Sequence, residues 1–429
     1  MKILIDGYNL GLEKGTGVAT YARNLSYELH NLGHSVSVLY GNHASSAKDG
    51  LLREVSFFDG AEERRGIVDI LTQVQHAVRG PLGHSAAAVP MTGAVISRTF
   101  EARLPYFDRM LNASDVFKRS QSAFKLWGGL SRVRVDDDPD LVHWTYPLPL
   151  TVAGRPNLYT VHDIVPLRLP YTTLDHKRRY LQLLRKLDRS ADHFVTVSEC
   201  SKRDMVEILG ISPDRITNTY QSVDIPASLR EKSEAQVARE VEGLAGVPYK
   251  GYFLFWGSIE PKKNIGRMIE AYLVSKVDAP LVIIGAQAWR SKGELKLLGS
   301  AETGPGVDAG KRIVRLPYAS FGLLVSLIRG ARAALFPSLY EGFGLPALEA
   351  MLLGTPVICS NTSSLPEVAG DAAFMVDPYD TVALTSAIRT VDADEGLRDD
   401  LGRRGVAQAA QFSPAAYRER LDGLYRRFR

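Results

Sequence analysis

Residues 333–349 read AALFPSLYEGFGLPALE, and this stretch decides how the rest of the chain is interpreted. The four apolar residues at its start predict a buried strand. Gly342 and Gly344 then allow a tight loop, and Pro346 suits the beginning of a helix because its φ angle is already helical. A strand, a glycine loop and a helix start in this order are typical of a parallel α/β sheet, which binds ligands at its strand ends.

Two carboxylates flank this loop. Glu341 directly precedes it, and Glu349 is expected on the first turn of the helix. Loop N–H groups and the positive end of the helix suit a diphosphate, whereas the carboxylates can accept hydrogen bonds from hydroxyl groups of a sugar and a ribose. A glutamate near a helix start can also be purely structural, but the whole string favours a ligand site. On this interpretation Glu341 serves a ligand, and its removal should leave the fold intact.

Two series of alternating strands and helices lie on either side of a polar segment at residues 225–247. We expect strands at 2–5, 35–40, 141–144, 158–161 and 194–197, and then at 252–256, 281–284, 313–316, 333–336, 357–359 and 373–376. The pattern predicts an α/β protein with two doubly wound, Rossmann-like domains that face a central cleft. The expected domains are 1–235 and 236–412, with a helix at 413–429 that packs back on the first domain. Residues 41–138 show no clear period and are interpreted as an insertion of loops and helices.

Composition limits the alternatives. The 429 residues are 45% hydrophobic and 23% charged with a net charge of only +4, which does not suggest a nucleic-acid partner. Neither the two cysteines nor the nine histidines show metal-ligand spacing. We find no signal peptide and no apolar run that could span a bilayer, so a cytoplasmic protein is expected, at most peripheral at a membrane.

The segment EGFGLPALEAMLLGTPVI, which begins at Glu341, resembles the signature of the retaining glycosyltransferases of family 4, also called group 1 glycosyltransferases. Their mark is two glutamates separated by seven residues, and the similarity continues through SNTSSLPEVAGDAAFMVDP at 360–378. The resemblance implies a GT-B fold in which Glu341 positions the donor sugar and Glu349 binds the ribose. It also implies that the donor diphosphate lies on the intervening loop, at Gly342, Phe343, Gly344 and Leu345.

Other donor-binding residues follow from the same resemblance. The run GSIEPKKN at 257–264 is similar to the family loop that supplies cations to the diphosphate. Lys263 matches the family lysine, whereas Ser258 stands where many members carry arginine, and Lys262 is expected to make up that charge. Pro317 and Tyr318 follow a strand where members place the nucleobase.

The first domain contributes fewer matches. The loop KGTGV at 14–18 is not the dinucleotide fingerprint GxGxxG, and no such fingerprint supports a nicotinamide oxidoreductase. By resemblance, Gly15 and Gly17 approach the donor phosphate from across the cleft. His162 is the candidate contact to the donor sugar, and Asp163 either orients its ring or binds the acceptor.

The resemblance implies transfer of a hexose, with retention and without metal or cofactor, to a hydroxyl of a growing, lipid-linked surface glycan. The mannosyltransferase-like subset is the best match, which favours GDP-mannose as donor. A UDP- or dTDP-sugar, or a catalytically silent nucleotide-sugar-binding protein, remains the alternative. The basic stretch 176–180 is either a solvated helix face or a contact to anionic lipid at the cytoplasmic face of the inner membrane.

Overall fold

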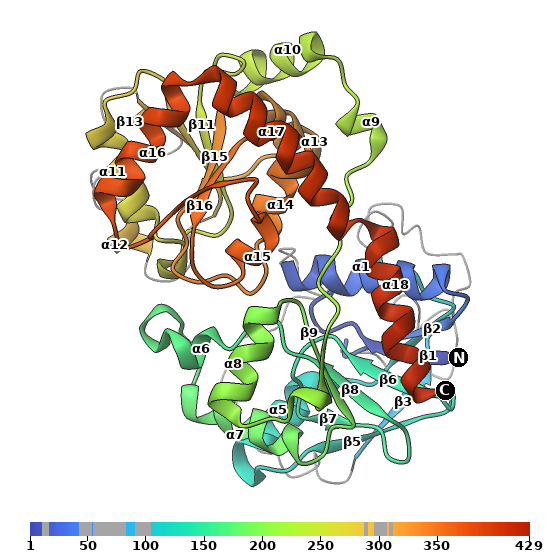
Figure 1. The fold of residues 1–429 in the computed structure, drawn as a ribbon. Coiled ribbons are helices and arrows are strands. Elements are labelled where there is room, and N and C mark those ends of the chain that lie inside the picture. Colours follow the sequence, from blue (N-terminus) through green and yellow to red (C-terminus); the bar gives the residue numbers. More distant parts are fainter. Residues whose placement is uncertain are drawn as a thin grey trace.

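The computed structural model describes residues 1–10, 17–42, 54, 83–90, 104–286, 291–295, 307–308 and 312–429. Two sheets with flanking helices lie one above the other in Figure 1, and the linking chain runs between them. The expected α/β architecture of two Rossmann-like domains is confirmed.

The first sheet has ten strands in the order β10-β9-β8-β6-β1-β2-β4-β3-β5-β7. Its centre is parallel: Ile3 lies opposite Val36 of one neighbouring strand and Leu141 of the other. The strands expected from the sequence are β1 (Lys2–Asp6), β2 (Ser35–Tyr40), β6 (Leu141–Trp144), β8 (Asn157–Thr160) and β9 (His193–Thr196), and β10 (Ile216–Asn218) adds an edge.

The interpretation of residues 41–138 as an insertion of loops and helices was wrong for the part that the structure describes. That part supplies β3 (His84–Ala88), β4 (Arg109–Asn112), α5 (Val116–Trp127) and β5 (Ser131–Val135), and β7 (Leu150–Thr151) follows. Strand β4 pairs in parallel with β2, whereas β3 runs antiparallel to β4. These strands are short and rich in small or charged residues, which hides them from a search for apolar runs. Residues 43–53, 55–82 and 91–103 of the segment lie outside the described residues.

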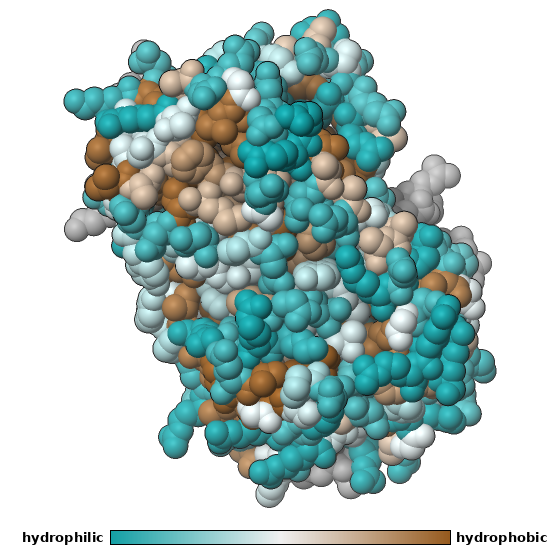
Figure 2. Space-filling view, in the orientation of Figure 1, coloured by the Kyte–Doolittle hydropathy of each residue, from teal (hydrophilic) through white to brown (hydrophobic). Residues whose placement is uncertain are grey.

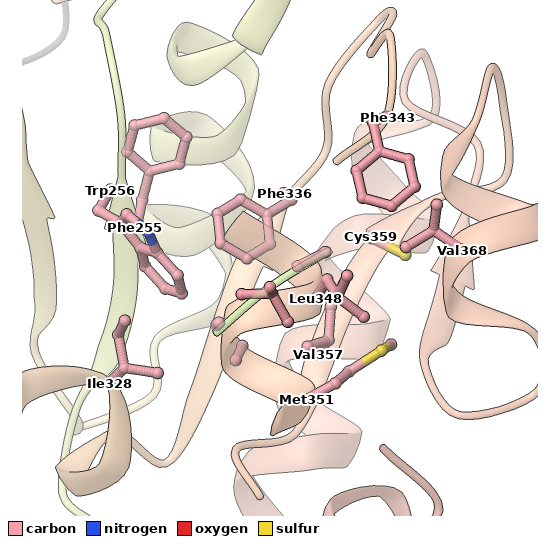
Figure 3. Packing of buried hydrophobic residues seen from close by; sticks show 14 of the residues in the cluster. Phe255, Trp256, Ile328, Phe336, Phe343, Leu348, Met351, Val357, Cys359 and Val368 are labelled. Atoms are coloured by element: carbon pink, nitrogen blue, oxygen red, sulfur yellow. The ribbon is translucent and has the colours of Figure 1, made fainter. Parts of the chain in front are cut away.

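The second sheet has seven strands in the order β13-β14-β12-β11-β15-β16-β17. They are β11 (Phe253–Trp256), β12 (Leu281–Ile284), β13 (Val307–Asp308), β14 (Ile313–Leu316), β15 (Ala333–Phe336), β16 (Val357–Ser360) and β17 (Phe374–Val376). Figure 3 shows Phe336 beside Trp256 and Leu348 in the core of this domain. The rings of Trp256 and Phe336 meet edge to face at 4.8 Å between centroids. Burying each such side chain contributes about 2 kcal/mol and fixes β15 under the glycine loop.

Helices cover the sheets. The first domain carries α1 (Gly17–Asn31), α6 (Val165–Arg168), α7 (Lys177–Asp188) and α8 (Glu199–Leu209). The later helices are α9 (Ala227–Arg230), α10 (Glu234–Ala245), α11 (Ile265–Ser275), α12 (Ser291–Glu294), α13 (Phe321–Gly330), α14 (Leu345–Leu352), α15 (Leu365–Ala369), α16 (Thr381–Ala393), α17 (Glu395–Ala409) and α18 (Pro414–Tyr425).

The chain crosses between the domains twice. Helices α9 and α10 contact α13 of the second domain, so the first crossing is at residues 219–226 and not at the expected boundary of 235. The second crossing leads into α18, which lies against α1 in Figure 1. Tyr425 of α18 is fully buried and its hydroxyl lies 2.5 Å from Nδ1 of His143 in the first sheet. The two crossings touch, because Val223 N donates to Phe412 O at 3.3 Å.

None of the described helices combines the length and the apolar character needed to cross a membrane. On the face shown in Figure 2, hydrophilic residues spread over both domains.

Candidate active site

Glu341 lies in the loop between β15 and α14, and its carboxylate is held on several sides. Lys263 Nζ lies 2.7 Å from one carboxylate oxygen and 2.8 Å from the other, and Ser338 Oγ donates to the carboxylate at 2.7 Å. Ser363 accepts a hydrogen bond from the Glu341 backbone N–H at 3.0 Å. Only 7% of the residue is exposed. The carboxylate is therefore fixed in place before any ligand binds.

Electrostatics keep this carboxylate ionised. Burial by itself raises the pKa of Glu341, but the positive charges of Lys263 and Lys262 and the hydrogen bonds outweigh it, so the pKa lies below its ordinary value. Lys262 shows the reverse balance: burial lowers its pKa, while the carboxylates of Asp163, Glu260 and Glu341 raise it more. The two lysines and Glu341 form one charged cluster. Lysine ammonium groups that are fixed in this way can stabilise a departing diphosphate.

A short 3₁₀ helix, Pro261–Lys263, places the two lysines. It ends at Asn264, whose φ of 59° is left-handed and whose amide donates to the carbonyls of Pro337 and Pro378 at 2.9 and 2.7 Å. Lys262 O in turn accepts from Leu339 N at 2.8 Å. These bonds tie the GSIEPKKN loop to the loop before Glu341, so the lysines expected from the sequence do meet it.

Gly342 brings the second domain against the first. A Cβ at this position would lie 2.9 Å from His162 O and 3.1 Å from Asp163 Oδ2. Ser201 Oγ bridges the same place, since it donates to His162 O at 2.8 Å and lies 3.4 Å from Gly342 O. A Cβ here would force the neighbouring atoms to shift, so this glycine allows the close approach of the loops that follow β8 and β15.

His162 is held in one orientation. Its Nε2 donates to Thr145 O at 2.9 Å, and its ring meets Tyr21 edge to face at 4.8 Å. Burial lowers the pKa of His162, and the Thr145 carbonyl and Asp163 offset this only in part. The imidazole is therefore neutral near pH 7, with Nδ1 as an acceptor.

Glu349 does not lie where the sequence suggested. Helix α14 begins at Leu345, so Glu349 occupies the second turn and not the first. Trp256 Nε1 donates to its carboxylate at 3.0 Å, which joins the ends of β11 and α14. Burial raises the pKa of Glu349 to about 7, although the indole hydrogen bond opposes the shift.

The glycine loop has its backbone oriented by Ser364. Its hydroxyl lies 2.9 Å from Glu341 O and 2.8 Å from Phe343 O. Gly344 caps α14 with a φ of 107°, a region that L side chains rarely adopt. The Phe343 ring packs against Tyr220 and Phe412 at the crossings, so only its backbone is available to a ligand.

The remaining sequence candidates fall into two groups. Gly17 faces the second domain, because a Cβ there would lie 3.6 Å from Leu345 Cδ1, whereas Gly15 lies outside the described residues. Ser258, Pro317 and Tyr318 are exposed at the carboxyl ends of β11 and β14, with Tyr318 78% exposed. Strand order places β14, β12, β11 and β15 side by side, so these ends form one continuous edge.

Four residues that hold the two glutamates and the glycine loop were not among the candidates found in the sequence. Ser338, Ser363 and Ser364 fix Glu341 and its loop, and Trp256 fixes Glu349. Ser363 and Ser364 lie in the SNTSSLPE run that carried the resemblance, so a signal existed there, but nothing around Trp256 distinguishes it from a core residue. Among the described residues, no three His, Cys, Asp or Glu side chains gather as metal ligands.

Comparisons with known proteins show the family of the chain. The family described as Glycosyl transferases group 1 matches residues 246–408, and the one described as Glycosyltransferase Family 4 matches residues 15–225. The O-antigen chain mannosyltransferase B of Escherichia coli is 35% identical over 263 residues, 59% of this chain and 66% of that protein. The serotype-specific mannosyltransferase WbdA of Escherichia coli is 26% identical over 275 residues, 63% of this chain but 33% of its own length.

The sucrose-phosphate synthase from Thermosynechococcus elongatus shares the fold, with a TM-score of 0.66 and 16% identity over 100% of this chain and 99% of that one. Fold and site together define the class of two-domain GT-B proteins. The chain belongs to the family 4, or group 1, glycosyltransferases. The matched regions span about two thirds of the first mannosyltransferase and a third of the second.

Proposed function

We propose that the chain is a retaining mannosyltransferase that transfers mannose from GDP-mannose to a hydroxyl of a growing, lipid-linked surface glycan. The single observation that carries the proposal is the preformed cluster of Lys263, Lys262 and Glu341, followed directly by Gly342, which lies against His162 of the other domain. Three of the similar proteins are named as O-antigen or serotype-specific mannosyltransferases, which supports mannose as the sugar and a surface glycan as the acceptor.

In the proposed reaction the bond between the mannose C1 and the diphosphate breaks, and a bond from C1 to the acceptor oxygen forms on the same face. Lys263, Lys262 and the amides of the glycine loop stabilise the charge that develops on the departing diphosphate. The acceptor proton moves to an oxygen of that phosphate, so GDP leaves as the product. Glu341 positions the sugar hydroxyls, and Glu349 accepts hydrogen bonds from the ribose.

An aromatic and polar surface next to His162 supports an acceptor sugar. The ring centroids of Tyr8 and Tyr146 lie 6.0 Å apart, just beyond the ends of β1 and β6. Gln121 Nε2 donates to Tyr8 OH at 3.2 Å. Asn9 is 7% exposed, and no residue of the described chain accepts a hydrogen bond from its Nδ2. A buried donor without a partner is costly unless a ligand satisfies it. Asp163, near Tyr146, belongs to the same surface.

A peripheral site of action at the cytoplasmic face of a membrane is part of the proposal. Arg178, Arg185 and Lys186 of α7 are exposed, and Leu174 just before the helix is 66% exposed. Exposed cations along a helix, with an exposed apolar side chain before its first turn, suit anionic lipid. Vesicles with phosphatidylglycerol should therefore sediment the protein more strongly than vesicles of phosphatidylcholine alone. Equal sedimentation would favour the solvated helix face.

The donor is tested directly by measuring hydrolysis and transfer with GDP-mannose, UDP-glucose, UDP-N-acetylglucosamine and dTDP-rhamnose. GDP-mannose should be preferred, and excess EDTA should leave the rate unchanged because lysines and amides replace the metal. A preference for a UDP- or dTDP-sugar would overturn the donor and leave the family untouched. Absence of turnover with every donor and acceptor would favour a nucleotide-sugar-binding protein.

A further inference from the structure

Helix α8 of the first domain begins against a carboxylate of the second. Glu367, in α15, accepts hydrogen bonds from Glu199 N at 2.8 Å and from Cys200 N at 2.9 Å. These are the first two residues of α8, and their N–H groups have no partner inside the helix. Ser198 caps the third, Ser201 N, at 3.0 Å. The second domain thus completes the cap of a helix in the first, where a negative charge is also favoured by the helix dipole.

The capped turn leads to the site. The hydroxyl of Ser201, one residue beyond Cys200, donates to the backbone carbonyl of His162 at 2.8 Å and lies 3.4 Å from that of Gly342. One turn later, Tyr340 OH donates to Asp204 Oδ2 at 2.5 Å. Helix α8 is therefore held by the second domain at its beginning and in its second turn, and Ser201 lies between these contacts.

Glu367 also touches the first chain crossing. Tyr220 OH lies 3.5 Å from Glu367 Oε2, and Tyr220 has a left-handed φ of 58°. Asn218 Oδ1 accepts from Tyr220 N at 2.8 Å, and the amide of Asn218 donates to Glu199 Oε1 at 2.9 Å. The crossing, the start of α8 and α15 of the second domain are thereby linked through one carboxylate.

We propose that Glu367 is a positioning residue: by capping α8 it holds Ser201, which fixes the backbone of His162 against the Gly342 loop while the donor sugar reacts. Glu367 contacts neither the sugar nor the diphosphate in this arrangement. The proposal rests on the function proposed above, because it assigns a role in donor turnover at the same site. It predicts a defect in turnover and not in donor binding, since the lysine cluster and the glycine loop stay in place.

The experiment compares Glu367→Ala, Glu367→Gln and the wild type in the full chain. Glu367→Ala should lower kcat for GDP-mannose hydrolysis by about tenfold to a hundredfold, as expected when reacting groups are misplaced by about 1 Å. The GDP dissociation constant should change less than about twofold. Glu367→Gln, whose amide oxygen still accepts one N–H, should recover part of kcat. Amide exchange at residues 199–201 should accelerate in Glu367→Ala.

Glu294→Ala is the matched control. Its carboxylate accepts from Gly266 N at 2.9 Å near the start of α11, but both residues belong to the second domain. This variant should leave kcat and exchange in α8 unchanged. An unchanged kcat in Glu367→Ala, or an equal loss in Glu294→Ala, would overturn the positioning role. If the wild type turns over no donor, the proposed function fails, whereas unchanged α8 exchange in Glu367→Ala would show separately that the cap itself is not made.

Discussion

Lys263 and Glu341 form a bidentate ion pair, with Nζ 2.7 and 2.8 Å from the two carboxylate oxygens. Both side chains are largely buried. In the proposed function Lys263 binds the donor diphosphate and Glu341 binds the donor sugar. The ion pair therefore already joins the two side chains that would contact the donor. When the donor binds, Lys263 must interact with both the Glu341 carboxylate and the diphosphate. The position of Lys263 therefore depends on that of Glu341, and the reverse.

Removing the Glu341 side chain should affect both stability and turnover. The sequence led us to expect that Glu341 serves a ligand and that its removal leaves the fold intact. In the structure Glu341 also pairs with Lys263, so the loss of its charge removes the partner of a largely buried lysine. Glu341→Ala should lower the free energy of unfolding by about 3 kcal/mol, and Glu341→Gln, which can still accept from Ser338, by less. Both variants should lose more than about tenfold in kcat/KM. Urea unfolding and initial rates provide the measurements; a stable Glu341→Ala with more than a tenth of the wild-type kcat/KM would contradict both roles.

The ion pair predicts a strong coupling between its two residues. In a double-mutant cycle of Lys263→Met and Glu341→Gln, the double variant should be more stable than the sum of the single losses by about 1–3 kcal/mol. Lys263→Met should also weaken GDP binding by about tenfold or more, which calorimetry can measure. For the stability measurement, Lys262→Met serves as the comparison. Lys262 Nζ lies 3.6 Å from Glu260 and makes no ion pair with both oxygens of a carboxylate among the described residues. Additive stabilities in the cycle would refute the coupling.

Glu349 predicts a specific pH dependence. Its pKa is raised to about 7 in the folded protein from an ordinary value of 4.5, so the folded state holds a proton that the unfolded state has released. The stability contributed by this group is complete below pH 4.5 and is lost as the pH rises through 7, by roughly 3 kcal/mol. Glu349→Gln should remove this part of the slope. Unfolding curves between pH 5 and 8 test it, and identical slopes in both proteins would exclude the raised pKa.

GDP binding should also depend on the ionisation of Glu349. Its affinity should rise with pH, whereas the stability contributed by Glu349 falls with pH. Ribose hydroxyls donate hydrogen bonds, so they favour the ionised form of Glu349. GDP affinity should therefore rise between about pH 5 and 7. The ligand phosphates titrate too, so the wild type must be compared with Glu349→Gln at each pH. A constant ratio of the two affinities would show that the ribose does not bind this carboxylate.

Gly342→Ala should separate the two domains at the site. The added Cβ would lie 2.9 Å from His162 O, so the loops that follow β8 and β15 must move apart. We expect kcat to fall by about tenfold to a hundredfold, with GDP binding to the second domain largely kept. Gly243→Ala is the control: no atom lies within 4 Å of its Cβ position in α10, and it should stabilise the protein by about 0.5–1 kcal/mol. Wild-type kcat in Gly342→Ala would show that this close approach is not needed.

The sequence predicted the central strands well, because parallel strands buried on both faces are short apolar runs with clear ends. It failed for β3 and β5, in which small or charged residues alternate with few apolar ones at the edge of the sheet. For the site, the glutamates and lysines were expected from the resemblance of EGFGLPALE and GSIEPKKN to the motifs of family 4. The hydrogen bond from Trp256 to Glu349 and the contact of Gly342 with His162 depend on how separate elements meet, which local patterns do not encode.

The paired crossings determine how the two halves can move. A single connecting segment would allow swivelling in any direction. Here residues 219–226 run beside the turn before α18, joined by the hydrogen bond from Val223 to Phe412, and the ring of Tyr220 lies 5.3 Å from that of Phe412. Two adjacent connections restrict the relative motion of the halves more than one connection would. A pair of labels, on α7 and α15, would follow any opening of the molecule about these crossings.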